Sequence, residues 1–162
     1  MIRSELDSNP LKEAGRDFLS RFLGESHVMS LLHGEVLTDQ SPRKFRRSTE
    51  GRALAVAQDL VHVIAVHHGF SGRLKISSNN APGKRGISYD LDLTSRMRRE
   101  TAVSHKARLD AFSVDMAETI MAYKEVRGDE MGDYPPDAEE VYNRAEELLD
   151  LVSRALPTLP IL

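Results

Sequence analysis

The sequence predicts an α+β protein that is predominantly helical, with about five helices and one β-hairpin (about residues 73–93) inserted before a long C-terminal pair of antiparallel helices. Over most of the chain apolar residues recur every three or four positions, which is typical of helices with one buried face. At residues 73–77 and 87–93 the period changes to two, and the turn-forming run SNNAPGKRG lies between these segments. A chain of 162 residues with 40% hydrophobic and 29% charged residues predicts a single domain over residues 1–162.

The first 41 residues are expected to form N-terminal helices. Asn9 and Pro10 resemble the cap and the first residue of a helix. The apolar residues that follow at helical spacing are Leu11, Ala14, Phe18 and Phe22. Gly24 ends this pattern, and the segment from Ser26 to His33 is expected to form a second short helix.

A core helix is expected from Ser41 and Pro42 to about His68, with a break near Gly51 as an open alternative. Its apolar residues are distributed over nearly the whole helix circumference; they are Leu54, Val56, Leu60, Val61, Val63 and Ile64. A helix that is apolar on all sides is normally buried, so this segment is predicted to be the central core element.

The hairpin is predicted from two alternating segments, in which Leu74 and Ile76 share one face of the first strand. The apolar residues of the second strand are Ile87, Tyr89, Leu91 and Leu93. On the polar face, Arg73 and Lys75 are candidates for cross-strand pairing with Asp90 and Asp92, although the register is left open.

Two amphipathic helices are expected after the hairpin. The first runs from about Ser95 to about Val126 with the stripe Leu109, Phe112, Met116, Ile120 and Tyr123. The second opens at Asp137, which forms a predicted capping box with Glu140. Its stripe is Ala138, Val141, Ala145, Leu148, Val152 and Leu156. Because the connecting loop is short, the two helices are expected to pack antiparallel, followed by an apolar tail over residues 157–162.

Charge is distributed unevenly, although the net charge is only −3. Residues 42–108, the expected core helix and hairpin, hold fourteen Lys and Arg against five Asp and Glu. Residues 109–156, the expected helical hairpin, hold four Lys and Arg against thirteen Asp and Glu. Such asymmetry indicates contact with a polyanion, or two regions that face each other within the fold or across an oligomer.

Basic residues cluster at two expected helix starts and at the hairpin tip, and they are the candidate nucleic-acid or anion-binding residues. They are Arg43, Lys44, Arg46, Arg47, Lys84, Arg85, Arg96, Arg98 and Arg99. A helix N-terminus disfavours cations by about 0.3–1 kcal/mol each, whereas its free amides attract phosphate. The hairpin tip is expected about 20 Å from Arg96, a span that a nucleic-acid backbone can bridge and a single phosphate cannot. The alternative is that these arginines pair with acidic residues of the C-terminal helices, such as Glu118, Asp129 or Glu139.

These observations predict a small non-enzymatic binding or regulatory protein that contacts nucleic acid through residues 42–108. The alternative is a protein-interaction, assembly or inhibitor protein that acts through its C-terminal helices and charged faces, with a homo-oligomer as one form. DNA and RNA are not distinguished by the sequence. The polar N-terminus and the absence of a long apolar run favour a soluble cytoplasmic protein without membrane contact.

No catalytic, metal or cofactor motif is recognised. The chain has no cysteine, which excludes disulfides and thiolate metal sites. The spacing of the histidines does not match paired metal ligands, and Asp90 with Asp92 is a weak candidate for Mg²⁺. Ser30 and His33 lack a third orienting residue in the sequence, and the Gly-Lys of the hairpin tip lacks the spacing of a phosphate-binding loop.

Overall fold

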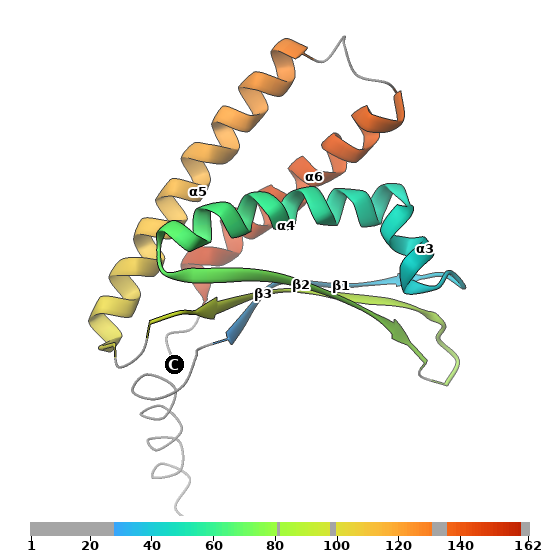
Figure 1. The fold of residues 1–162 in the computed structure, drawn as a ribbon, viewed down its shortest axis with the longest axis horizontal. Helices are drawn as coiled ribbons and strands as arrows, with labels where there is room; N and C mark the ends of the chain where they lie inside the picture. The colour runs from blue at the N-terminus through green and yellow to red at the C-terminus, as the bar shows by residue number, and fades with distance from the viewer. Residues whose placement is uncertain (1–27, 81, 98–99, 131–135, 160–162) are drawn as a thin grey trace, which may run out of the picture.

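A three-stranded antiparallel β-sheet carries the described helices on one of its faces (Figure 1). The computed structural model describes residues 28–80, 82–97, 100–130 and 136–159. In chain order the elements are β1 (Val28–Leu37), α3 (Pro42–Arg47), α4 (Thr49–His67), β2 (Phe70–Asn79), β3 (Gly86–Ser95), α5 (Ala102–Glu130), α6 (Pro136–Ala155) and the 3₁₀ turn η2 (Leu156–Thr158). The predicted class is confirmed in its coarse form, α+β and mostly helical, and this part of the chain contains four α-helices.

β3 is the central strand, because it pairs antiparallel with β1 on one side and with β2 on the other. Alternate side chains of β3 are buried on the helix-covered face; these are Ile87, Tyr89, Leu91 and Leu93. The intervening side chains lie half-buried on the opposite face; these are Ser88, Asp90, Asp92 and Thr94. The alternation is typical of an antiparallel sheet with one face in the core.

The two alternating segments of the sequence form β2 and β3, which are longer than predicted at both ends. Arg73 pairs in register with Asp92, and Lys75 with Asp90. The Lys75 Nζ lies 3.6 Å from Asp92 Oδ2, so the ion pair is diagonal. The predicted cross-strand positions are therefore confirmed, but only Lys75 forms an ion pair, Asp90 contacts His33 instead, and the hairpin is part of a larger sheet.

The third strand corrects the prediction of a short helix over Ser26–His33, because Val28–Leu37 is β1. A register shift between Ser30 and Leu32 marks a β-bulge in this strand. The bulge lets Leu31 and Leu32 both be buried, which interrupts the period of two and produces a spacing that resembles a helix. The expected helical character of residues 1–41 is therefore wrong for β1, and the helix expected after Asn9 lies outside the described residues.

The expected core helix is divided at Ser48 into α3 and α4, three residues before the suggested break at Gly51. The Ser48 Oγ caps α4 by accepting a hydrogen bond from the amide of Gly51 at 3.2 Å. α4 buries one side only, since Val63 is 59% and Val66 is 40% exposed. The prediction that this helix is buried all round is wrong, because α4 lies over the sheet and turns its other side to solvent.

The two C-terminal helices run antiparallel, as predicted (Figure 1). Their apolar stripes are buried, and two ion pairs connect them: Lys124 Nζ to Asp150 Oδ1 at 3.0 Å and Arg127 Nη1 to Glu146 Oε2 at 3.2 Å. α5 begins at Ala102, whereas the sequence suggested about Ser95, because β3 extends through Ser95.

A buried ion pair fixes the connection between β3 and α5. The Arg108 guanidinium donates to both carboxylate oxygens of Glu100, at 2.7 and 2.6 Å. It also donates to the backbone oxygens of His68 and Gly69 and to Ser95 Oγ, and it lies over the ring of Phe70. This side chain therefore holds the end of α4, the start of β2 and the end of β3 against α5.

The absence of a side chain at Gly51 allows α3 and α4 to meet. A Cβ at this position would collide with the backbone oxygen of Phe45 and would lie 2.7 Å from the Cα of Arg46. We expect Gly51→Ala to lower the free energy of unfolding by about 1–3 kcal/mol, because backbone atoms must shift. Urea denaturation measures this loss. Ala55→Gly, at an exposed position of the same helix, serves as the control and should cost about 1 kcal/mol or less. A Gly51→Ala protein as stable as the wild type would contradict this account.

The buried pair also predicts how stability depends on pH. Burial lowers the pKa of His105, whose Nδ1 lies 3.2 Å from Glu100 Oε1, and the hydrogen bonds from Arg108 lower the pKa of Glu100. Both pKa values are lower in the folded state, so the unfolded state takes up more protons on acidification. The stabilisation by His105 should therefore be lost as the pH falls below about 6.5, and that by Glu100 below about 4.3.

Measuring the free energy of unfolding between neutral and acidic pH tests this prediction. His105→Gln should reduce the slope in the histidine range, which can reach about 1.4 kcal/mol per pH unit for one proton. Ala107→Gln introduces the same side chain at an exposed position of the same helix without removing a titratable group, and it should leave the slope unchanged. Equal slopes in all three proteins would exclude His105 as the titrating group.

Candidate nucleic-acid interface

Two of the three predicted basic clusters lie at the same end of the sheet, where α3 stands beside the tip of the hairpin (Figure 1). A surface hollow is lined by Ser41 and Pro42 from the start of α3 and by Asn80 and Arg85 from the tip. We refer to this surface as the basic end and define it by its six cations: Arg43, Lys44, Arg46, Arg47, Lys84 and Arg85.

The local structure of α3 directs its cations outward. Ser41 caps the helix by accepting a hydrogen bond from the amide of Lys44 at 3.3 Å, and Pro42 occupies the first turn. Phe45 is buried, with 1% of its surface exposed, and anchors this helix to the core. The four basic side chains flank this anchor and are all exposed.

The expected electrostatic penalty at this helix start is not what the structure shows. α3 has only six residues, and Lys44, Arg46 and Arg47 belong to its last turn. Positive charge is favourable near a helix C-terminus, because the backbone carbonyls there carry the negative end of the dipole. The sequence suggested the opposite because it placed these residues in the first turns of one long helix.

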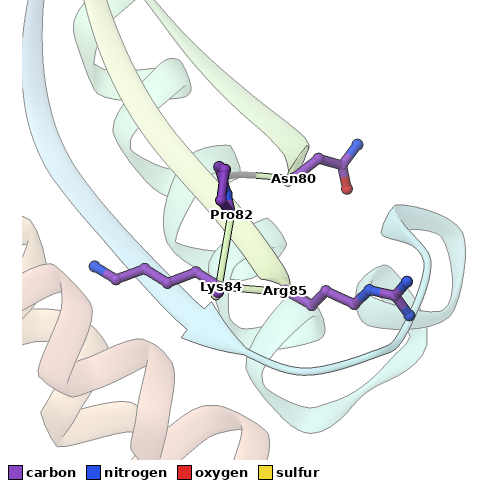
Figure 2. Close-up of a pocket in the computed structure, with 5 residues that line it drawn as sticks. Asn80, Pro82, Lys84 and Arg85 are labelled. Atoms are coloured by element: carbon purple, nitrogen blue, oxygen red, sulfur yellow. The ribbon is translucent and has the colours of Figure 1, made fainter.

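The hairpin tip presents its two cations in different directions. Gly83 adopts a positive φ of 79°, which a glycine accommodates without strain. In Figure 2 the side chains of Lys84 and Arg85, directly before β3, point to opposite sides of the chain. The backbone oxygen of Arg85 accepts a hydrogen bond from the amide of Thr38 at 3.3 Å, so the tip is attached to the segment that leads into α3.

The cations of the basic end have no partners among the described carboxylates. Other basic residues of the described chain do form ion pairs; they are Arg52, Lys75, Lys106, Arg108, Lys124, Arg127 and Arg144. Of the acidic residues named in the alternative, Glu118 and Glu139 form no ion pair with these cations, and the side chain of Asp129 lies outside the described residues. Glu50 and Glu147 bind Arg144 of α6 instead.

The third basic cluster is not brought to this surface. Arg96 is exposed but follows the other end of β3, and Arg98 and Arg99 lie outside the described residues. Ten residues of β3 separate the two ends of the sheet, which corresponds to about 30 Å. α5 begins at Ala102 and is capped by Thr101, so Arg96 precedes this helix and does not belong to its first turn.

Three hollows surround the hairpin tip, and Arg85 lines each of them. The largest, of about 600 Å³, lies within the tip itself and is bordered by Asn80, Pro82 and Lys84 (Figure 2). A second, of about 360 Å³, is bordered by Leu37 and Lys84. The third, of about 290 Å³, lies between residues 38–42 and the two strand ends of the hairpin. The basic end is thus a hollowed surface rather than a smooth one.

The polar face of the sheet does not form a catalytic arrangement. The His33 Nδ1 lies 2.5 Å from Asp90 Oδ1, and Ser30 Oγ donates to the same oxygen at 3.5 Å. Both groups therefore contact the carboxylate, and the hydroxyl is not hydrogen-bonded to the imidazole that would have to activate it. Asp92 pairs with Lys75, and nowhere in the described chain do three His, Asp or Glu side chains converge as metal ligands would.

None of the described helices combines the length and the apolar character that crossing a bilayer requires. No protein-family model, curated protein or solved structure matches this chain.

Proposed function

We propose that this protein binds nucleic acid through the phosphate backbone, with the basic end as the interface. The observation that carries the proposal is the contrast in pairing. Seven cations elsewhere in the described chain form ion pairs with carboxylates, and the three that do not, Arg73, Arg96 and Arg154, lie apart from one another. The six of the basic end are exposed, have no such partner among the described residues and are gathered on one surface. A phosphate backbone supplies regularly spaced negative charge that neutralises such a group of cations.

The framework of the basic end supports this function. Phe45 and the Ser48 cap fix α3, and the ladder of β2 and β3 fixes the hairpin, so the cations are held on ordered elements. Holding like charges together is unfavourable in the free protein, and a bound polyanion removes that repulsion and releases condensed counterions. Residues 109–156 hold thirteen Asp and Glu against four Lys and Arg, and an acidic region of this kind favours approach of the ligand to the basic end.

Arg96, with Arg98 and Arg99, is the proposed second contact for a longer nucleic acid. The separation of about 30 Å along β3 corresponds to about nine nucleotide steps of a duplex. A short ligand bound at the basic end does not reach Arg96, so these arginines contribute only when the nucleic acid follows the sheet.

The salt dependence of binding tests the proposal. We expect a fluorescent oligonucleotide to bind with an affinity that falls steeply with salt, and Arg46→Ala/Arg47→Ala to reduce the slope of log K against log salt by about two. The matched control is Arg73→Ala/Arg154→Ala, which removes two exposed cations away from the basic end. Absence of binding at low salt, or an equal effect of both double variants, would refute the proposal.

A second candidate is self-association through α5, which the outer face of that helix favours. Val103, Val114 and Met121 are 81%, 59% and 64% exposed. Their separations of eleven and seven residues place them on one side of the helix, opposite Phe112 and Met116 of the core. Asp110, paired with Lys106, lies on the same side between Val103 and Val114, so this surface is apolar only in part. A surface of this kind can be covered by the same surface of a second copy in a two-fold dimer.

Light scattering at increasing protein concentration tests this second candidate. We expect the wild type to form a dimer and Val114→Asp/Met121→Asp to be monomeric, because a charge in the centre of this surface opposes its burial. Glu118→Gln, at a nearby position of α5, serves as the control and should leave the dimer intact. A wild-type protein that is monomeric at every concentration would exclude self-association.

A further inference from the structure

The smallest of the three hollows at the basic end is lined mainly by polar residues and could hold one small polar group. It lies between residues 38–42 and the ends of β2 and β3, and its volume of about 290 Å³ is close to the lower end of small-molecule sites, about 300 Å³. We propose that this hollow binds one unpaired purine base of a single-stranded or looped nucleic acid. This inference rests on the proposed function and adds the form of ligand that the interface selects.

The walls of the hollow provide groups that read base edges. The side chains of Gln40, Asn80 and Arg85 line it, are exposed, and make no side-chain hydrogen bond within the described structure. Carboxamide groups form paired hydrogen bonds with adenine, and guanidinium groups do so with guanine. The hydroxyls of Thr38 and Ser41 each accept a bond from a nearby amide, which fixes their positions in the wall.

The charge of the lining favours a base over a phosphate. The carboxylate of Asp39 borders the same hollow as Arg85, and it repels an anion that enters. The cations of α3 and Lys84 lie around the hollow instead of inside it. In the proposed complex the phosphates of the nucleic acid therefore contact the cations around the hollow, and the neutral base enters the hollow itself.

The concave shape favours an unpaired base over a duplex. Bases in a duplex present their edges at the bottom of grooves, which convex elements such as a helix or a β-ribbon enter. A hollow instead accepts a group that protrudes from its own chain, as an unstacked base does. The aromatic residue of α3, Phe45, is buried and cannot stack on that base, so recognition falls to hydrogen bonds.

The two walls are held together before any ligand binds. The amide of Thr38 donates to the backbone oxygen of Arg85, and Leu37 is paired in register with Gly86. A Cβ at Gly86 would lie 3.2 Å from the carbonyl carbon of Val36 and closer still to its oxygen, so the strands approach tightly at this point. Little ordering is required on binding, which supports a selective site.

Binding of short oligonucleotides tests the inference. The probes are oligo(dA), oligo(dT), their ribose counterparts and the oligo(dA)·oligo(dT) duplex, each about ten nucleotides long, measured by fluorescence anisotropy. We expect single-stranded oligo(dA) to bind about five- to tenfold more tightly than oligo(dT) and more tightly than the duplex. Gln40→Ala/Asn80→Ala should reduce the preference to within about twofold and leave the salt slope unchanged. Ser77→Ala/Thr94→Ala, on the other face of the sheet, is the matched control and should retain it.

The outcomes distinguish failure of the purine site from failure of the proposed nucleic-acid binding. Salt-dependent binding without a purine preference, or tighter binding of the duplex, would overturn the inference while the proposed function stands. A preference that persists in Gln40→Ala/Asn80→Ala would also overturn it, since the base would then be read elsewhere. Absence of binding to every probe at low salt would refute the proposed function and this inference with it. Amide NMR shifts confined to residues 38–42 and 78–86 on adding oligo(dA) would independently support the site.

Discussion

The pairing of β3 with both of its neighbours is the constraint on which the rest of the described structure depends. One face of this strand buries four large apolar side chains under the helices, and the same strand joins the two parts of the sheet that come from distant parts of the chain. Its beginning carries the hairpin tip, and its end leads into the connection that Arg108 fixes against α5. The strand thereby sets the separation between the basic end and Arg96.

Electrostatic pairing divides the surface into two kinds of region. Around α5 and α6, basic side chains meet carboxylates from neighbouring elements, and the bidentate contact of Arg144 with Glu50 links α6 to α4. Exposed pairs of this type contribute little to stability, typically below about 1 kcal/mol. Their main consequence here is that the basic side chains of α5 and α6 are neutralised while surplus carboxylates keep this region acidic, whereas the cations of the basic end have no carboxylate partner among the described residues. The proposed function places the polyanion at the basic end of a protein whose total charge is negative.

The proposed division of labour at the basic end follows from the same geometry. Cations on α3 and at the hairpin tip form the border, and the polar hollow between them combines a carboxylate with amide and guanidinium groups. Backbone contacts at the border give affinity without selecting sequence, and groups inside the hollow can select it. The cap at Ser48 and the close approach of α4 to α3 at Gly51 hold α3, and the hydrogen bond from the Thr38 amide to the Arg85 oxygen attaches the hairpin tip to the segment before α3.

Local patterns in the sequence determined a large part of this fold. The period of two identified β2 and β3, the spacing of apolar residues identified α5 and α6, and the clustering of Lys and Arg identified the candidate residues. These features depend on neighbours along the chain, so periodicity and charge are sufficient to find them. The spacing of eight between Glu100 and Arg108, about two helical turns, was also visible in the sequence but carried no signal of burial by itself.

Tertiary structure alone decided the identity of β1, the length of α3 and the pairing state of each cation. The apolar spacing of residues 28–37 resembles that of a helix, because the bulge in β1 buries two consecutive leucines. Only the hydrogen-bonded pairing with β3 makes this segment a strand. α3 ends where Ser48 turns back to cap α4, a choice that depends on the contact of Gly51 with Phe45. Whether an arginine is neutralised depends on carboxylates far away in the chain, as Glu50 is from Arg144. Such contacts are set by the packing of the whole chain, which no local pattern encodes.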